Sequence, residues 1–481
     1  MTLRQQAAHG VRWTSMSMVV TTVVGIVQVA VLARLLTRQD FGLVSEMATI
    51  IGFAMVFADM GFSAAIIWRQ DATRDELSTL YWMNLVTGVV LFGVMIAIAP
   101  LIADFYHQPR IEHLMLWTSL IFLVTPIGQQ FQILLQKQLL FRRLSGIEMV
   151  ASIVGLCVGV TAAVAHYGVY ALIWAQLANA TTKSLLLAGY GWSHWRPHLH
   201  LRLRDLKGYF SFGLYQMGEN GVYYWASNID YLLIGRFLGA TPLGIYTIAY
   251  QLVVLPLTKL VPVLTRVSFP VFAKRQHDDA ALRRGYGEVI ELMSFAVWPL
   301  LVGLAASAPV AMVAIYGSKW LASAVVVQLL VPMGMVKAIG SPIGSLLNSK
   351  GRADIGFWYN LLSTVVTVTV LYVAVHWGVR AVAASHSVIQ VCSLPVELWL
   401  LWTVIRLRPA DYLRRLAGPF VTCAIMGAIV YATYLAIHPG LRPLTCLLLL
   451  IAEGGAVYVG LWAAFRRDYV SGLWRQLAAR A

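Results

Sequence analysis

One stretch of this chain, residues 208–233, carries a row of polar and aromatic side chains in an otherwise apolar sequence. The row contains Gln216, Glu219, Asn220, Ser227, Asn228 and Asp230, together with Tyr215, Tyr223, Tyr224 and Trp225. Glu219 and Tyr223 are four residues apart, and Ser227 and Asp230 continue at helical spacing, so a helix would align them on one face. Such a face is expected to line water, or alternatively to hold neighbouring helices together by hydrogen bonds.

Charged side chains also lie within or beside other apolar runs, where ionisable groups usually face a cavity or a partner. Lys183 and Lys259 are near enough to the ends of their runs either to reach a membrane surface or to serve a cavity. Arg12 opens the first run. Asp59, near the end of the second, either satisfies a neighbouring arginine or helix end or has a functional role. The candidate ion carriers are Glu219, Asp230 and Asp59, and the candidate cavity residues are Arg12, Lys183, Tyr223, Asn228 and Lys259.

The motifs of soluble catalysis are missing from this sequence. It contains no GxxxxGK[ST] phosphate-binding loop, no HExxH and no GxSxG. Its four cysteines (Cys157, Cys392, Cys423 and Cys446) fall inside apolar runs, without the spacing of a metal or redox site. We therefore expect no catalytic residue, no metal ion and no cofactor.

The composition assigns these residues to a membrane protein. Of the 481 residues, 59% are hydrophobic and 12% are charged, whereas about 25% of the residues of a soluble domain are charged. In a soluble protein, a formal net charge of +15 would suggest nucleic-acid binding. Here the basic residues alternate with apolar runs instead of forming one patch, so we expect membrane topology and no nucleic-acid partner.

Fourteen apolar runs are long enough for a transmembrane helix, which needs about 20 residues. Two pairs of runs are nearly continuous and separate only at His166–Gly168 and at His376–Gly378. The first run lacks a clear cleavage site, so we expect it to be retained as a helix. The predicted fold is all-α integral membrane, with spans near 15–36, 42–67, 79–103, 113–135, 147–166, 168–190, 208–233, 243–265, 289–315, 321–346, 355–376, 380–405, 416–437 and 443–465.

The basic residues predict the orientation of these spans. If the N-terminus faces the cytoplasm, 26 of the 36 lysines and arginines fall in cytoplasmic segments and seven in outside segments. This asymmetry alternates from loop to loop, as the positive-inside rule requires. Both termini are therefore predicted to be cytoplasmic.

Short sequence matches indicate an internal duplication. Arg34 and Gly42 match Arg236 and Gly244 at an offset of 202 residues, and the segment from His166 matches the segment from His376 at an offset of 210. Each copy would hold six helices, so both would cross the bilayer in the same sense and pack as parallel bundles around a central cavity. The predicted divisions are residues 1–207, residues 208–412, and residues 413–481 with two appended helices and a tail. Arg34 and Arg236 would either form an outer gate or cap helices.

Several motifs resemble the polysaccharide-transport flippases of the Wzx and colanic-acid-exporter type, in the multidrug/oligosaccharidyl-lipid/polysaccharide exporter superfamily. The resemblance covers most of the chain, is most specific in the first 240 residues and thins after about residue 400. It rests on the segments Gly10–Ser15, Leu32–Leu36, Asp40–Val44, Phe57–Ser63, Glu76–Thr79 and Asn228–Arg236.

The resemblance implies two six-helix lobes around a central cavity, and two further helices. It also implies a substrate, an undecaprenyl-diphosphate-linked oligosaccharide repeat unit, moved by alternating access across the bacterial inner membrane for exopolysaccharide or O-antigen synthesis. Membrane lipids, and the polymerase and chain-length proteins of the same pathway, would be its partners. Arg12, Lys183 or Lys259 would attract the diphosphate, and the face of 208–233 would hold sugar.

Two other functions are compatible with the sequence. An ion-coupled multidrug or small-molecule exporter of the same superfamily would tolerate a less basic cavity. A membrane polysaccharide polymerase or ligase normally carries a sizeable periplasmic loop with catalytic residues, and every outside loop predicted here is short.

Overall fold

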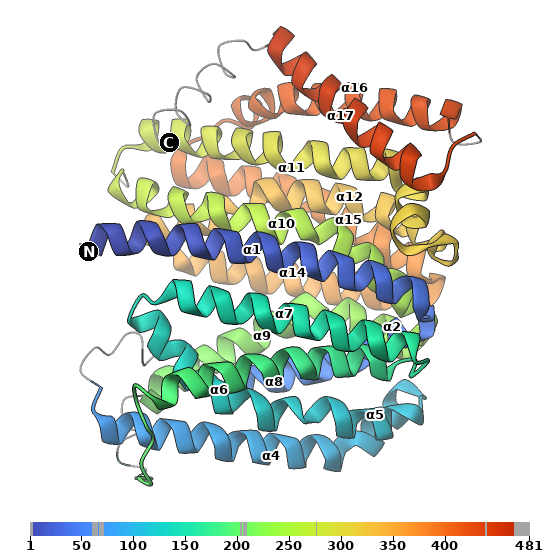
Figure 1. The fold of residues 1–481 in the computed structure, drawn as a ribbon. Coiled ribbons are helices and arrows are strands. Elements are labelled where there is room, and N and C mark those ends of the chain that lie inside the picture. The colour runs from blue at the N-terminus through green and yellow to red at the C-terminus, as the bar shows by residue number, and fades with distance from the viewer. Residues whose placement is uncertain are drawn as a thin grey trace. The chain divides into compact units, whose positions relative to one another are not determined.

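The computed structural model describes residues 3–59, 66, 72–202, 204, 209–275, 277–437 and 440–465. Across these ranges the secondary structure is helical, without a strand (Figure 1). The chain divides into two compact units, Met1–Gly244 and Ile245–Ala481. The lobe boundaries predicted at 207/208 and 412/413, and the placement of two bundles around a cavity, stay predictions. The predicted tail after residue 465 lies outside the described residues.

The first unit is built from long helices that run side by side. Contacts join α7 to α1 and α8, α6 to α4 and α8, and α2 to α9. Its helices are α1 (Leu3–Leu35), α2 (Arg38–Ala58), α4 (Arg74–Tyr106), α5 (Arg110–Ser119), α6 (Ile121–Lys137), α7 (Phe141–Val164), α8 (Tyr170–Trp192) and α9 (Tyr209–Leu238).

The second unit has α11 at its centre, because α11 contacts α12, α16 and α17. Its core packs Tyr286, Ile290 and Trp298 of α11 with Tyr412 of α16 and Trp462 of α17. Its helices are α10 (Ala240–Lys274), which begins at the end of the first unit, α11 (Asp279–Tyr316), α12 (Ala322–Gly340), α13 (Pro342–Ser349), α14 (Ala353–Ala374), α15 (Val379–Ile405), α16 (Pro409–Ile437) and α17 (Pro443–Phe465).

The predicted helical membrane fold is confirmed, since each of the fourteen apolar runs corresponds, within the described residues, to a helix or a helix pair; the end of the run 42–67 lies largely outside those residues. Among the described residues, twelve helical segments have the length and apolar composition of a membrane span, with α5–α6 and α12–α13 each counting as one. The other two runs form α8 and α9, which are 23 and 30 residues long. These two helices carry Lys183 and the polar row of 208–233, so both helices of unusual polarity are among those predicted to hold functional groups.

Local sequence explains where several helices begin and end. The side-chain oxygens of Thr37 and Thr73 accept hydrogen bonds from the backbone N–H groups of Asp40 and Glu76, whose carboxylates accept in return, so α2 and α4 each begin with a capping box. The nearly continuous runs separate at Gly168 (φ 58°) and Gly378 (φ 92°), in a left-handed region that glycine adopts without steric cost. The predicted breaks at both turns are therefore confirmed.

Two repeat-related glycines make reciprocal contacts. A Cβ on Gly42 would overlap the carbonyl oxygen of Ala240, and a Cβ on Gly244 would overlap the carbonyl oxygen of Arg38. Because Ala240 and Arg38 are also 202 residues apart, each contact is the counterpart of the other. Reciprocal contacts of this kind are what a two-fold axis between two copies of a segment produces. They support the duplication inferred from the sequence.

Gly42→Ala should destabilise the protein by about 1–3 kcal/mol, because its methyl group would have to separate two backbones that touch. The measurement is thermal unfolding of the purified protein in detergent. Gly25→Ala is the matched control, since nothing lies within 4 Å of a Cβ at Gly25. Equal unfolding temperatures for the two variants would contradict the close approach of α2 and α10.

Candidate functional site in the first unit

A polar cavity of about 460 Å³ lies among α2, α6 and α8 of the first unit. This volume is within the range of small-molecule binding sites, about 300–1,000 Å³. Its polar lining residues are Asp59, Thr125, Gln129, Gln132, Gln136, Asn179, Lys183 and Ser184, and its apolar ones include Met55, Ala58, Ile133 and Leu187.

The polar lining follows from helical spacing on two helices. Gln129, Gln132 and Gln136 are spaced i, i+3 and i+7 along α6, so they share one face of that helix. Asn179 and Lys183 are four residues apart on α8 and likewise share a face. The two polar faces therefore meet in one cavity.

A glycine on α6 allows this close packing. A Cβ on Gly128 would lie 2.5 Å from the Cα of Ser184, which is a clash with the backbone of α8. Any larger residue at 128 would push α6 away from α8. Gly128 therefore holds the two polar faces at the distance that defines the cavity.

The charged groups of the cavity are held in place by neighbouring side chains. The amide of Gln129 donates a hydrogen bond of 2.5 Å to Asp59 Oδ1. Lys183 Nζ lies 3.8 Å from Glu148 Oε1 of α7, and both side chains are partly exposed. The hydroxyl of Ser17 on α1 donates to the other carboxylate oxygen of Glu148, at 3.4 Å. Lys183 is thus oriented without losing access to the cavity.

These groups match the chemistry of a sugar or a phosphate. Side-chain amides donate and accept hydrogen bonds, so the three glutamines and Asn179 can pair with hydroxyl groups in either sense. The carboxylate of Asp59 accepts from hydroxyls. The ammonium of Lys183 presents three donors and a positive charge to an anion. No other group in the lining carries a positive charge.

The structure brings together two of the residues that the sequence singled out, Asp59 and Lys183. Arg12 is exposed on α1 and is not part of this lining, and Tyr223 and Asn228 belong to α9. Lys259 lies on α10 in the second unit and is partly exposed. The roles predicted for these four residues stay predictions.

The predicted face of α9 is exposed along part of its length. Glu219, Tyr223 and Ser227 are exposed, Tyr223 at 72%, whereas Asp230 is only 1% exposed. The amide of Asn228 donates to the carbonyl of Tyr224 at 2.8 Å, one turn earlier on the same helix. The side chains of Tyr215 and Gln216 lie outside the described residues. Three residues of the predicted face, Glu219, Tyr223 and Ser227, are therefore accessible at the protein surface, and their cavity role stays a prediction.

The repeat-related arginines lie in the last turns of their helices, Arg34 on α1 and Arg236 on α9. A cation there interacts favourably with the helix dipole. Arg236 is hydrogen-bonded to His107, and its guanidinium lies 5.4 Å from the centroid of the Phe105 ring. Arg236 thus joins the ends of α9 and α4. A gate role for either arginine stays a prediction.

Sequence reasoning missed the glutamines of α6. Their signal was present, because three glutamines at i, i+3 and i+7 interrupt an apolar run on one helical face. Glutamine carries no charge, so a search for ionisable groups within spans passes over it.

A buried carboxyl group was also missed. Glu46 of α2 is 0% exposed, and among the described residues neither of its carboxylate oxygens has a hydrogen-bond partner; the same holds for the buried hydroxyl of Tyr106 on α4. A Cβ on Gly235 of α9 would lie 3.1 Å from Glu46 Cγ and 2.8 Å from Tyr106 Cε1, so both side chains pack against this glycine. An ionised carboxylate without a partner is costly in such a place, so Glu46 is expected to hold a proton in this arrangement.

Comparison with known proteins identifies relatives in polysaccharide biosynthesis. Residues 31–326 match the family described as polysaccharide biosynthesis protein. The chain is 36% identical over 459 residues to the teichuronic acid biosynthesis protein TuaB of Bacillus subtilis (strain 168), covering 95% of each chain. It is 34% identical over 375 residues to the lipopolysaccharide biosynthesis protein WzxC of Escherichia coli (strain K12), covering 78% of this chain and 76% of WzxC. The resemblance inferred from the sequence motifs is confirmed.

Two solved structures share the fold. The inward closed conformation of the lipid II flippase MurJ matches with a TM-score of 0.76 and 12% identity, over 95% of this chain and 99% of MurJ. An inward-facing multidrug resistance MATE family transporter of the MOP superfamily matches with a TM-score of 0.63 and 13% identity, over 82% of this chain and 99% of the transporter. At such identities the likeness establishes the fold alone.

The cavity should admit water-soluble reagents. In a background without the four native cysteines, Gln132→Cys should react with a hydrophilic maleimide about tenfold faster than Gln130→Cys, because Gln132 lines the cavity whereas Gln130 is 0% exposed. Labelling is followed by a mass shift on gels. Equal rates at the two neighbouring positions would show that this part of α6 does not face a wet cavity.

Proposed function

We propose that this chain, which belongs to the polysaccharide biosynthesis protein family, is a flippase for undecaprenyl-diphosphate-linked oligosaccharide repeat units. It moves them from the cytoplasmic to the periplasmic leaflet of the inner membrane. The observation that carries this proposal is the cavity of α2, α6 and α8, in which a cation, a carboxylate and four side-chain amides converge within the membrane-spanning part of the chain.

The physical problem in such transport is the polar headgroup. An unpaired hydroxyl in hydrocarbon costs roughly 2–7 kcal/mol, and a sugar carries several beside the charges of a diphosphate. A protein lowers this barrier by replacing water with its own donors and acceptors. Gln129, Gln132, Gln136 and Asn179 supply these groups, while the polyprenyl tail remains in lipid.

Lys183 is the group proposed to attract the diphosphate, because its ammonium lines the cavity and its position is fixed by Glu148. Asp59 accepts from sugar hydroxyls and is oriented for this by Gln129. Arg12 and Lys259 are further candidates for the diphosphate, and Tyr223 and Asn228 for the sugar. The exposed ring of Tyr223 offers a face on which a sugar can stack.

Transport is proposed to follow alternating access driven by an ion gradient, since the sequence has no phosphate-binding loop of an ATPase. Glu219, Asp230 and Asp59 remain candidate ion carriers. Glu46 joins them, because it is buried, the part of the chain that the structure describes offers it no hydrogen-bond partner, and its protonation would respond to an opening of α2 and α9. Arg34 and Arg236 are the proposed outer gate.

The proposed setting is a bacterial inner membrane with both termini in the cytoplasm. The chain would act as a transporter rather than an enzyme, next to the polymerase and chain-length proteins of its pathway. The name of one relative, the succinoglycan biosynthesis transport protein ExoT of Rhizobium meliloti (strain 1021), is consistent with this. ExoT is 24% identical over 485 residues, covering 98% of this chain and 96% of ExoT.

Lys183→Gln should lower polymer export at least about tenfold in cells that depend on this gene, because a charge-assisted contact to the diphosphate is lost. Lys259→Gln should have the same effect if Lys259 also contacts the diphosphate. The measurement is surface polysaccharide per cell, with the amount of protein in the membrane determined in parallel.

Lys337→Gln is the matched control, since Lys337 lies on α12, is exposed and does not line the cavity of α2, α6 and α8. Its export should equal that of the unaltered protein. Normal export by Lys183→Gln would remove Lys183 from the proposed mechanism. Uptake of organic cations into vesicles, with no effect on polysaccharide, would point to a multidrug exporter instead.

A further inference from the structure

The second unit contains a basic cavity for which no ligand has been described above. It has a volume of about 570 Å³ and lies between the N-terminal part of α11, the first turns of α16 and the segment that connects α15 to α16. Its lining residues are Ala280, Arg283, Arg284, Glu291, Leu407, Asp411, Arg414 and Arg415. Four arginines and two acidic residues give the lining a formal charge of +2. We call this cavity the four-arginine pocket.

Two of the arginines are anchored by the fold. Arg283 Nη1 donates a hydrogen bond of 2.8 Å to the carbonyl of Ile405, the last residue of α15. The guanidinium of Arg415 crosses α11 at Gly287, where any Cβ would overlap it. Arg283 is therefore held by a hydrogen bond and Arg415 packs against the backbone of α11, and such ordering before a ligand binds reduces the entropy that binding would cost.

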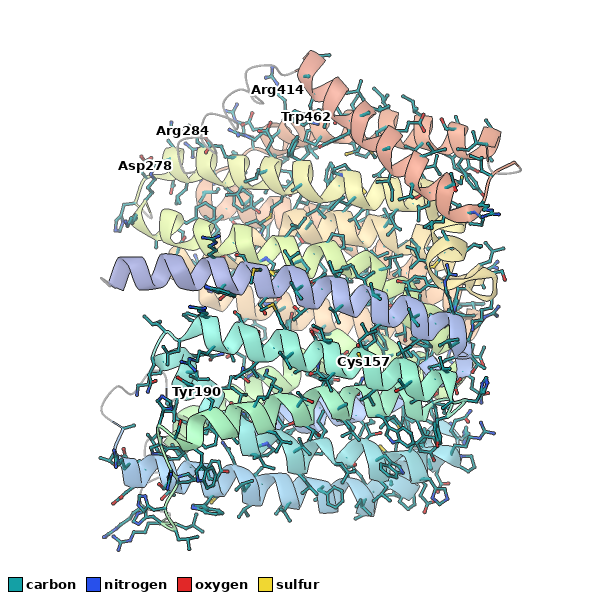
Figure 2. The ribbon with its side chains drawn as sticks, in the orientation of Figure 1. Cys157, Tyr190, Asp278, Arg284, Arg414 and Trp462 are labelled. Atoms are coloured by element: carbon teal, nitrogen blue, oxygen red, sulfur yellow. The ribbon has the colours of Figure 1, made fainter. Side chains whose placement is uncertain are left out.

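The other two arginines, Arg284 and Arg414, are exposed at the same end of the second unit (Figure 2). Arg284 is close to Asp278, the N-cap of α11. A hydrogen bond from the backbone N–H of Ala281, followed by the positive charges of Arg284 and Arg275, lowers the pKa of Asp278. In the lining itself, Glu291 and Asp411 offset two of the four guanidinium charges.

The position of the pocket favours a lipid over a soluble anion. α11 and α16 both begin here and α15 ends here, and all three have the composition of membrane spans, so the pocket lies at the depth of lipid headgroups. Leu413 and Phe420 are seven residues apart and so share one face of α16, where they are 55% and 56% exposed. They offer an apolar surface for acyl chains next to the cations.

An arginine at the end of a membrane helix can contribute to the orientation of the helix in the membrane without binding any ligand. Arg352 is an example, since it is exposed and forms an ion pair with Asp354. The four-arginine pocket differs because four guanidinium groups converge on one cavity and two of them are positioned by α15 and by Gly287. Guanidinium groups pair with phosphate oxygens in a bidentate manner, and basic pockets between membrane helices bind anionic headgroups.

We propose that the four-arginine pocket is a binding site for the phosphate of an anionic phospholipid. The lipid would hold the starts of α11 and α16 and the end of α15 together through one shared anion. This role is independent of the polysaccharide substrate and of the cavity in the first unit.

The test uses the purified full-length protein, in detergent, with three probes: phosphatidylglycerol, phosphatidylcholine and inorganic diphosphate. Phosphatidylglycerol should raise the thermal unfolding temperature and remain bound in native mass spectrometry, whereas phosphatidylcholine, which has no net charge, should do neither. Stabilisation by inorganic diphosphate alone would overturn the assignment to a lipid.

Variants distinguish lipid binding by the four-arginine pocket from nonspecific attraction of the lipid to positive charge. Arg284→Gln combined with Arg414→Gln should weaken phosphatidylglycerol binding at least about tenfold, because two charge-assisted contacts are lost. Arg352→Gln removes the same kind of charge outside the pocket and should bind normally. Gly287→Ala keeps every charge but displaces Arg415, and should also weaken binding. Equal retention of phosphatidylglycerol by all these proteins would overturn the proposal.

Discussion

A polar group within a membrane must be paired or must reach water, and this constraint organises the whole chain. Most of its spans satisfy it by being apolar. Helices α8 and α9 are of spanning length but fall outside the segments with a clear membrane composition. On α8, Asn179 and Lys183 are accommodated because α6 presents three glutamines to the same cavity and Glu148 pairs with the lysine. The polar residues of α8 are therefore tolerated in the membrane because they line this cavity.

Glu46 is subject to the same constraint, but it meets the constraint by remaining uncharged and not by pairing with another group. Its carboxyl group is buried between α2, α4 and α9 and has no hydrogen-bond partner within the described ranges, so this arrangement is favourable only while the group is uncharged. A rearrangement of α2 and α9 that admitted water would change the free energy of its ionisation. Packing and protonation are thus coupled at Glu46, which is what an ion-driven conformational cycle requires.

The fold could be predicted from the sequence because membrane helices are recognisable by the length and apolar composition of their segments. Even the two turns between nearly continuous runs were visible, at Gly168 and Gly378. The site could be predicted only in part. Asp59 and Lys183 stood out because they are charged, whereas Gln129, Gln132 and Gln136 required attention to a helical face. The polar faces of α6 and α8 meet because Gly128 contacts α8. This is a tertiary contact, so residue spacing along one helix cannot predict it. In the sequence, the four arginines of the second unit indicated only the membrane orientation of the chain. Their convergence on one pocket depends on tertiary contacts, which the sequence pattern does not show.

The central claim is that the cavity of α2, α6 and α8 carries a sugar headgroup through the bilayer. The most direct test reconstitutes the protein in liposomes with an undecaprenyl-diphosphate-linked oligosaccharide and measures how fast the inner-leaflet glycan becomes accessible to an external glycosidase. The account predicts that a variant with Gln129, Gln132 and Gln136 all changed to leucine folds but flips the glycan no faster than protein-free liposomes. Unimpaired flipping by that variant would contradict the account.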